Sequence, residues 1–146
     1  MDRIIPFEEQ YRDDLIFMIL EAKNALGVPP RLREDLLDIR RHYLEPGDMF
    51  WLAIDESDRV VGSVGCRSIE GTQEIWLHRL FVKYSRKRQG IGTRLLQTAE
   101  DYARGRGKTL VRVHLGGPRE QWFESYQFYP KFGYVEYAER YMKKEL

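Results

Sequence analysis

The sequence has very little cysteine and histidine. It contains one cysteine, Cys66, and three histidines among its 146 residues. A single cysteine cannot form an internal disulfide, and no group of cysteines and histidines has the spacing of zinc ligands. We therefore expect neither a disulfide scaffold nor a bound metal, and we interpret Cys66, inside an apolar run, as a small core residue. The lone cysteine fits a reducing, intracellular setting.

Long apolar runs are also missing. No segment approaches the roughly 20 apolar residues that a membrane-spanning helix needs. The first residues, Met1-Asp2-Arg3, continue into acidic, amphipathic sequence and do not resemble a signal peptide. The expected location is the cytoplasm, without membrane association.

An excess of charge of either sign is absent as well. Lys and Arg number 24 and Asp and Glu number 23, for a formal net charge of +1. No overall basic field therefore indicates nucleic acid as a partner, and any basic site must be local. Hydrophobic residues make up 42% of the chain, which suffices to bury a core, and the length predicts one domain over residues 1–146.

Apolar spacing and turn residues predict an alternating order of elements. The order is a strand (3–6), two helices (8–26 and 32–45), a hairpin (49–64), a strand (75–82), a helix (91–106), a strand (109–115), a helix (119–132) and a last strand (134–142). This order predicts an α/β or α+β fold.

The most informative stretch runs from Leu80 to Leu96, where a strand leads through a basic loop with two glycines into a long helix. The free N–H groups and the positive end of that helix point at one spot, and such a spot binds phosphate. Gly90 and Gly92 let the backbone approach a ligand closely. The loop and first turn add the local cations Arg86, Lys87, Arg88 and Arg94. We expect a pyrophosphate to bind here.

Two other phosphate motifs do not fit. The dinucleotide fingerprint needs a third glycine where this chain has Leu95. Gly107-Lys108-Thr109 resembles the end of a P-loop, but the opening glycine would fall at Tyr102 and the segment lies between a helix and a strand. Neither a Rossmann enzyme nor a nucleotide hydrolase is indicated.

The stretch 80–96 resembles the acetyl-coenzyme A motif of the Gcn5-related N-acetyltransferase (GNAT) superfamily, Arg/Gln-x-x-Gly-x-Gly/Ala between the fourth strand and the third helix. A second segment, residues 128–134, is similar to the Leu/Phe-Tyr-Glu-Lys-Leu-Gly-Phe ending of that family, and the order of elements agrees over nearly the whole chain. The sequence departs from the family at three positions: Lys87 replaces Arg or Gln, Trp122 replaces a frequent Asn, and Pro130 follows the tyrosine.

The resemblance implies a mixed, twisted, mostly antiparallel sheet that is flanked by helices and splayed between strands 4 and 5. It implies direct transfer of an acetyl group from acetyl-coenzyme A to a primary amine, which makes the protein an N-acyltransferase. The coenzyme would be held by backbone or side-chain groups of Leu80, Val82, Lys87, Arg88, Gln89, Gly90, Gly92, Thr93, Ser125 and Tyr129.

For the chemistry, Tyr129 matches the family tyrosine that protonates the departing thiolate. The base remains open between Glu74 and His78, because strand alternation places both on one face with Trp76, which occupies the position of the family's usual glutamate. His114 is a third candidate, whereas His42 is expected at the surface.

The acceptor is unassigned and is either a small molecule or a protein amine. Residues 10–44 and 135–142 would form its wall, and a homodimer is one option for assembly. Two alternatives remain: a non-catalytic acyl-coenzyme A-binding regulatory module, and a toxin of the same fold that acts on an RNA-linked amine. The balanced charge argues against the second.

Overall fold

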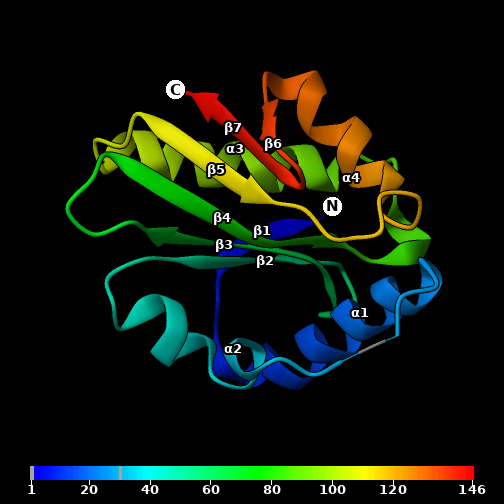
Figure 1. Ribbon diagram of the computed structural model, residues 1–146. Helices are drawn as coiled ribbons and strands as arrows, with labels where there is room; N and C mark the ends of the chain where they lie inside the picture. The colour runs from blue at the N-terminus through cyan, green and yellow to red at the C-terminus, as the bar shows by residue number, and fades with distance from the viewer. Residues whose placement is uncertain (1, 30) are drawn as a thin grey trace.

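The computed structural model describes residues 2–29 and 31–146. Its strands form one seven-stranded sheet in the order β1-β2-β3-β4-β5-β7-β6 (Figure 1). The strands are β1 (Arg3–Pro6), β2 (Phe50–Ile54), β3 (Val60–Ser68), β4 (Glu74–Val82), β5 (Leu110–His114), β6 (Val135–Ala138) and β7 (Tyr141–Glu145). Among the strands of the described residues, only β4 and β5 pair in parallel. The predicted mixed, mostly antiparallel sheet is confirmed.

Helices cover both faces of the sheet. They are α1 (Arg12–Ala25), α2 (Glu34–Leu37), α3 (Ile91–Gly105) and α4 (Phe123–Phe128), with the short helical turns η1 (Glu9–Tyr11), η2 (Arg40–Leu44), η3 (Tyr84–Arg86) and η4 (Tyr129–Phe132). Side chains of β2 alternate between two cores. Phe50 and Leu52 pack with α1, α2 and η2, while Trp51 and Ala53 pack on the other face with α3.

Two predicted elements differ from the structure. The expected helix over 32–45 is a short α2 followed by the π-helical turn η2, because Asp38 leaves the helical region with φ −145° and ψ 74°. The expected last strand over 134–142 is a hairpin of β6 and β7, which turns at Arg140 with φ 69°. The sequence therefore contains one strand more than predicted.

The sheet opens beside the end of β4. Pairing with β5 covers only Glu74 to Leu77, although β4 continues to Val82. On its other side β4 contains a bulge, where the register to β3 shifts between Ser63 and Gly65. Arg79 in this bulge has φ 55°, and its carbonyl accepts a hydrogen bond of 2.8 Å from the Ser63 hydroxyl. The predicted splay between the fourth and fifth strands is confirmed.

The opening leaves backbone groups of β4 unpaired. The Lys83 N–H donates to the Val61 carbonyl at 2.8 Å, so the backbone groups of Lys83 point toward β3. Backbone groups of successive residues point to opposite edges of a strand, so those of Val82 and Leu80 point away from β3, toward the opening.

Candidate functional site

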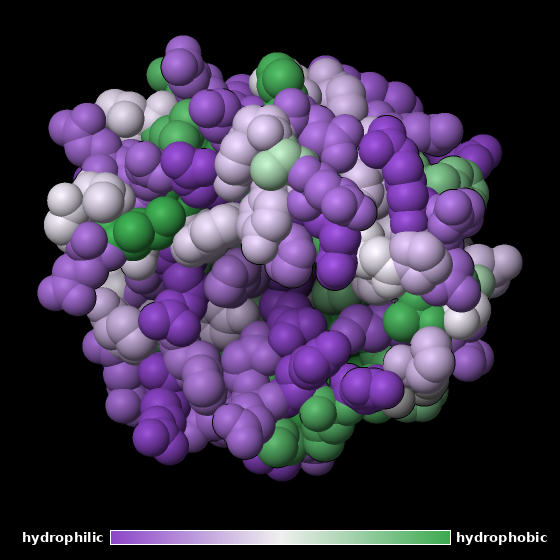
Figure 2. All heavy atoms as spheres, viewed as in Figure 1, coloured by the Kyte–Doolittle hydropathy of each residue, from purple (hydrophilic) through white to green (hydrophobic). Residues whose placement is uncertain are grey.

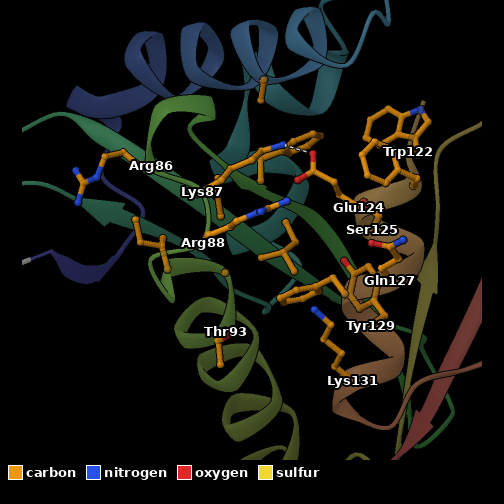
Figure 3. A pocket seen from close by; sticks show the side chains of 18 of the residues that line it. Arg86, Lys87, Arg88, Thr93, Trp122, Glu124, Ser125, Gln127, Tyr129 and Lys131 are labelled. Atoms are coloured by element: carbon orange, nitrogen blue, oxygen red, sulfur yellow. Dashed lines mark hydrogen bonds and ion pairs between the residues drawn. The ribbon is translucent and has the colours of Figure 1, made fainter. Parts of the chain in front are cut away.

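A first cavity of about 520 Å³ lies between the end of β4, the start of α3 and α4 (Figure 3). Its floor includes Leu80 and Val82, and its rim includes the basic loop that follows η3. Of the ten residues that the sequence predicts as coenzyme contacts, nine line this cavity: Leu80, Val82, Lys87, Arg88, Gly90, Gly92, Thr93, Ser125 and Tyr129.

The tenth, Gln89, lies outside the lining and its side chain is exposed. Its amide oxygen accepts a hydrogen bond of 2.9 Å from Arg86. The Arg86 guanidinium also binds both carboxylate oxygens of Asp2, at 3.0 and 2.7 Å. These two side chains therefore fix the loop, and any contact of Gln89 with a ligand would use its backbone.

The start of α3 has the geometry of an anion site. Gly90 caps the helix with φ 83°, a conformation that glycine adopts without strain, and no side chain caps the first turn. Lys87 reaches across the cavity to Glu124 of α4, with 2.8 Å between its ammonium and the carboxylate (Figure 3). Arg88 and Lys131 also line the cavity. Free N–H groups and nearby cations suit a phosphate or pyrophosphate.

A second cavity of about 500 Å³ adjoins the first. Five residues line both cavities: Leu80, Phe81, Trp122, Ser125 and Tyr129. The rest of its wall comes from α1, the α2–η2 region, β3, β4, β5 with the loop after it, and the β6–β7 turn. Figure 2 shows a recess bordered mainly by hydrophilic residues near the middle of the face seen in Figure 1. The two cavities meet at the splay of the sheet.

Tyr129 lies at this junction. It is 6% exposed, and burial raises the pKa of its hydroxyl above the ordinary value of 10.0. The hydroxyl makes no hydrogen bond with any other residue that the structure describes. A neutral phenol with a free proton between two cavities can act as a proton donor.

The second cavity contains all three histidines of the chain. His78 is a half-buried residue of β4, and burial, reinforced by the charge of Arg79, lowers its pKa to about 4. His114 stacks on Tyr141, with ring centroids 4.6 Å apart. His42, expected at the surface, is half-buried and lines this cavity.

Glu74, the other candidate base, is not brought to either cavity. It shares a strand face with Trp76 and His78 as predicted, but it lies at the opposite end of β4. Its carboxylate accepts a hydrogen bond from Arg112 of β5, and this bond lowers its pKa.

A half-buried charged cluster lines part of the second cavity. Arg79 donates two hydrogen bonds to Asp35, at 2.9 and 2.6 Å, and Tyr43 donates a third at 2.8 Å. Lys23 of α1 lines the same wall. The sequence analysis did not single out Lys23, although it follows Ile19 by four residues on the buried face of the helix, where a charge is unusual.

Comparison with known proteins decides the family. Residues 13–134 match the family model described as Acetyltransferase (GNAT) family. The chain belongs to the GNAT acetyltransferase family. An acetyltransferase of the GNAT family from Staphylococcus aureus Mu50 superposes with a TM-score of 0.89 at 23% identity, over 100% of this chain and 99% of that one. A GNAT acetyltransferase from Brucella melitensis, solved in complex with acetyl-CoA, has a TM-score of 0.71 at 17% identity, over 100% and 88%.

Curated relatives of this GNAT chain are named N-acetyltransferases. The probable N-acetyltransferase camello of Xenopus laevis is 45% identical over 82 residues, which cover 54% of this chain and 36% of the relative. N-acetyltransferase 8 of Homo sapiens is 36% identical over 87 residues, covering 56% and 38%. The chain thus matches less than half the length of these relatives. Among the described residues, no helix is long and apolar enough to cross a membrane.

Proposed function

We propose that this GNAT chain transfers an acetyl group from acetyl-coenzyme A directly to a primary amine. The observation that carries the proposal is the meeting of two cavities at Tyr129, one with an anion site at the start of α3 and one open to a second reactant. Direct transfer needs both reactants side by side, and two cavities with a common wall supply that arrangement.

The residues of the first cavity fit the coenzyme. The first-turn N–H groups after Gly90, together with Lys87 and Arg88, would hold its pyrophosphate. The unpaired backbone groups of Leu80 and Val82 would hydrogen-bond its amide-bearing arm as a neighbouring strand would. When bound, the coenzyme supplies the activated acetyl thioester. The acetyl-CoA complex of the Brucella melitensis relative supports this assignment.

Tyr129 is the proposed acid. Its hydroxyl has no other partner among the described residues and stays protonated at neutral pH, so it can donate a proton to the departing sulfur. His78 is the nearer of the two proposed bases to this point, because only His78 shares a cavity with Tyr129.

A pKa of about 4 makes His78 a poor base for an alkylammonium, whose pKa is near 10. His78 is therefore neutral and would accept a hydrogen bond from the amine. We expect the amine to reach the cavity already deprotonated by its equilibrium with solvent. The nitrogen loses one further proton as the amide forms, and this proton passes to solvent, from which Tyr129 regains the proton that it gives to the sulfur.

The proposal is tested by measuring thiol release from acetyl-coenzyme A with purified protein and a panel of amines, together with calorimetry of coenzyme binding. Amine-dependent thiol release supports the transferase. Coenzyme binding without thiol release would instead favour the regulatory module, and release only with aminoacylated RNA would favour the toxin. We place the protein in the cytoplasm as part of the same proposal.

A further inference from the structure

The second cavity has far more positive than negative charge. Among the described residues, cationic side chains from five parts of the fold line it, against a single carboxylate, that of Asp35: they are Lys23, Arg33, Arg67, Arg79 and Arg140. Asp35 is already paired with Arg79 by two hydrogen bonds. The other four cations form no ion pair with any residue that the structure describes. The wall therefore keeps a surplus of positive charge.

Lys23 is the most unusual of these cations. It is 7% exposed, although lysine is rarely buried without a partner. Its ammonium has no hydrogen bond to any described residue, and its contact in the wall is the ring of Phe81, whose centroid lies 5.9 Å away. Burial and the neighbouring charges of Arg79 and Arg33 lower its pKa. The ammonium itself opens onto the second cavity, and the nearby carboxylate of Asp35 is already paired with Arg79. An anion that enters the cavity would therefore find in Lys23 a cation free to bind it.

We propose that the second cavity binds an acidic group of the acceptor, with Lys23 as its anion-binding residue. The acceptor is then a small amine that also carries a carboxylate or a phosphate. This inference rests on the proposed acetyl transfer. A cavity of about 500 Å³ has room for a molecule of amino-acid size. The acid held by Lys23 leaves the amine free to face Tyr129, which lines the same cavity.

The same charges exclude other amines. Diamines, aminoglycosides and lysine-rich peptide segments bring further positive charge into a wall that already has an excess of it, so their binding is opposed. Arg33, Arg67 and Arg140 are exposed and would attract an acidic molecule toward the entrance, whereas Lys23 lies deeper.

The experiment compares matched acceptors at saturating acetyl-coenzyme A. Each α-amino acid is paired with its carboxamide, and each aminoalkyl phosphate with the corresponding amino alcohol. Because the neutral partner has a lower amine pKa, rates are compared per concentration of the deprotonated amine, so that the acidic group is the difference that remains. For wild-type protein we expect kcat/KM to be about tenfold or more higher for one acidic series than for its neutral partners. The series with the larger ratio of acidic to neutral kcat/KM shows whether the cavity prefers a carboxylate or a phosphate.

Lys23→Met keeps the unbranched shape and most of the length of the side chain and removes its charge. We expect it to bring the ratio of acidic to neutral acceptors close to one, mainly through KM of the acid, with KM for acetyl-coenzyme A unchanged. Since the variant buries no charge, its melting temperature should equal or exceed that of wild type. Lys108→Met, whose ammonium binds the Thr72 carbonyl at the far end of β4, is the control and should keep the wild-type ratio.

A readout without turnover uses inorganic phosphate as the probe. With coenzyme A saturating the first cavity, phosphate should raise the melting temperature of wild type more than that of Lys23→Met.

The inference is overturned if neutral or cationic amines are the better acceptors, if Lys23→Met lowers both series equally, or if it raises KM for acetyl-coenzyme A instead. Those results leave the proposed transfer intact. Absence of thiol release from every amine would overturn the proposed transfer itself.

Discussion

The hydroxyl of Tyr43 lies 3.4 Å from Nδ1 of His78 and donates its proton to Asp35 at 2.8 Å. A phenol has one proton, and an ionised carboxylate can only accept. The long contact to His78 must therefore use Nδ1–H as donor, which leaves Nε2 of the neutral ring as its accepting nitrogen. We predict that nitrogen chemical shifts will show His78 in the Nδ1–H form at pH 7, and the opposite tautomer would contradict this network.

The low pKa of His78 links its charge to folding. The unfolded residue takes up a proton near pH 6.5, whereas the folded residue does so only near pH 4. The unfolded state therefore binds more protons over this interval, and stability falls as the pH decreases from 6.5 to 4. His78→Gln should remove the part of this loss of stability that comes from protonation of His78. Urea unfolding of both proteins between pH 7 and 4 measures it, and a difference in unfolding free energy that does not change with pH would count against a buried neutral His78.

Tyr129→Phe should lower kcat by about a hundredfold, within the range of a lost general acid, with KM for acetyl-coenzyme A nearly unchanged. Because the pKa of Tyr129 lies above 10.0, the wild-type rate should show no decline from its ionisation below that pH. Tyr126→Phe is the matched control in α4, since the Tyr126 hydroxyl donates to the Gly116 carbonyl and not into the junction. Stopped-flow or single-turnover rates give the chemical step, and equal rates for both variants would show that Tyr129 only packs and does not donate the proton.

Gly90→Val should abolish calorimetrically detectable binding of acetyl-coenzyme A. A β-branched residue at φ 83° costs about 1–2 kcal/mol or displaces the loop, and displacement moves the first-turn N–H groups. Gly105→Ala, at the other end of α3, has open space for the added methyl group and is the control. Retained affinity in Gly90→Val would show that the loop does not hold the coenzyme.

Glu124→Gln should tighten coenzyme binding several-fold. The carboxylate of Glu124 holds the Lys87 ammonium at 2.8 Å and places a negative charge in the cavity proposed for phosphates. Removing this charge frees the Lys87 ammonium and lowers the repulsion between the cavity and the phosphates of the coenzyme. The gain in affinity should be smaller at high salt, where charges are screened. Glu120→Gln, an exposed neighbour outside the cavity lining, should leave the affinity unchanged.

The fold and the anion loop were predictable because their signals are local. Apolar residues of α3 recur at helical spacing, and the two glycines stand at the start of that helix, after a basic loop that follows a strand. The β6–β7 turn was not predictable, since Glu139 and Arg140 are not turn-forming types and Arg140 takes φ 69° at some cost.

Most of the second cavity could not be predicted from the sequence. Lys23, Asp35, Arg79 and Arg140 are far apart in the chain and come together only through the sheet and the β4 bulge. Strand alternation placed Glu74 and His78 on one face correctly, but it could not show that their separation along β4 leaves Glu74 with Arg112.

The gap between β4 and β5 also has a consequence for solubility. A sheet ordinarily has two outer edges, but the segment after Leu77 adds an inner edge whose amide and carbonyl groups have lost their neighbour. Such edges invite pairing with other chains. Here α4 and the loop before α3 lie over that edge, and a ligand that hydrogen-bonds to the backbone of Leu80 and Val82 would pair its free groups. Aggregation during heating or storage should therefore be slower with coenzyme A present, because occupancy blocks a site of strand exchange.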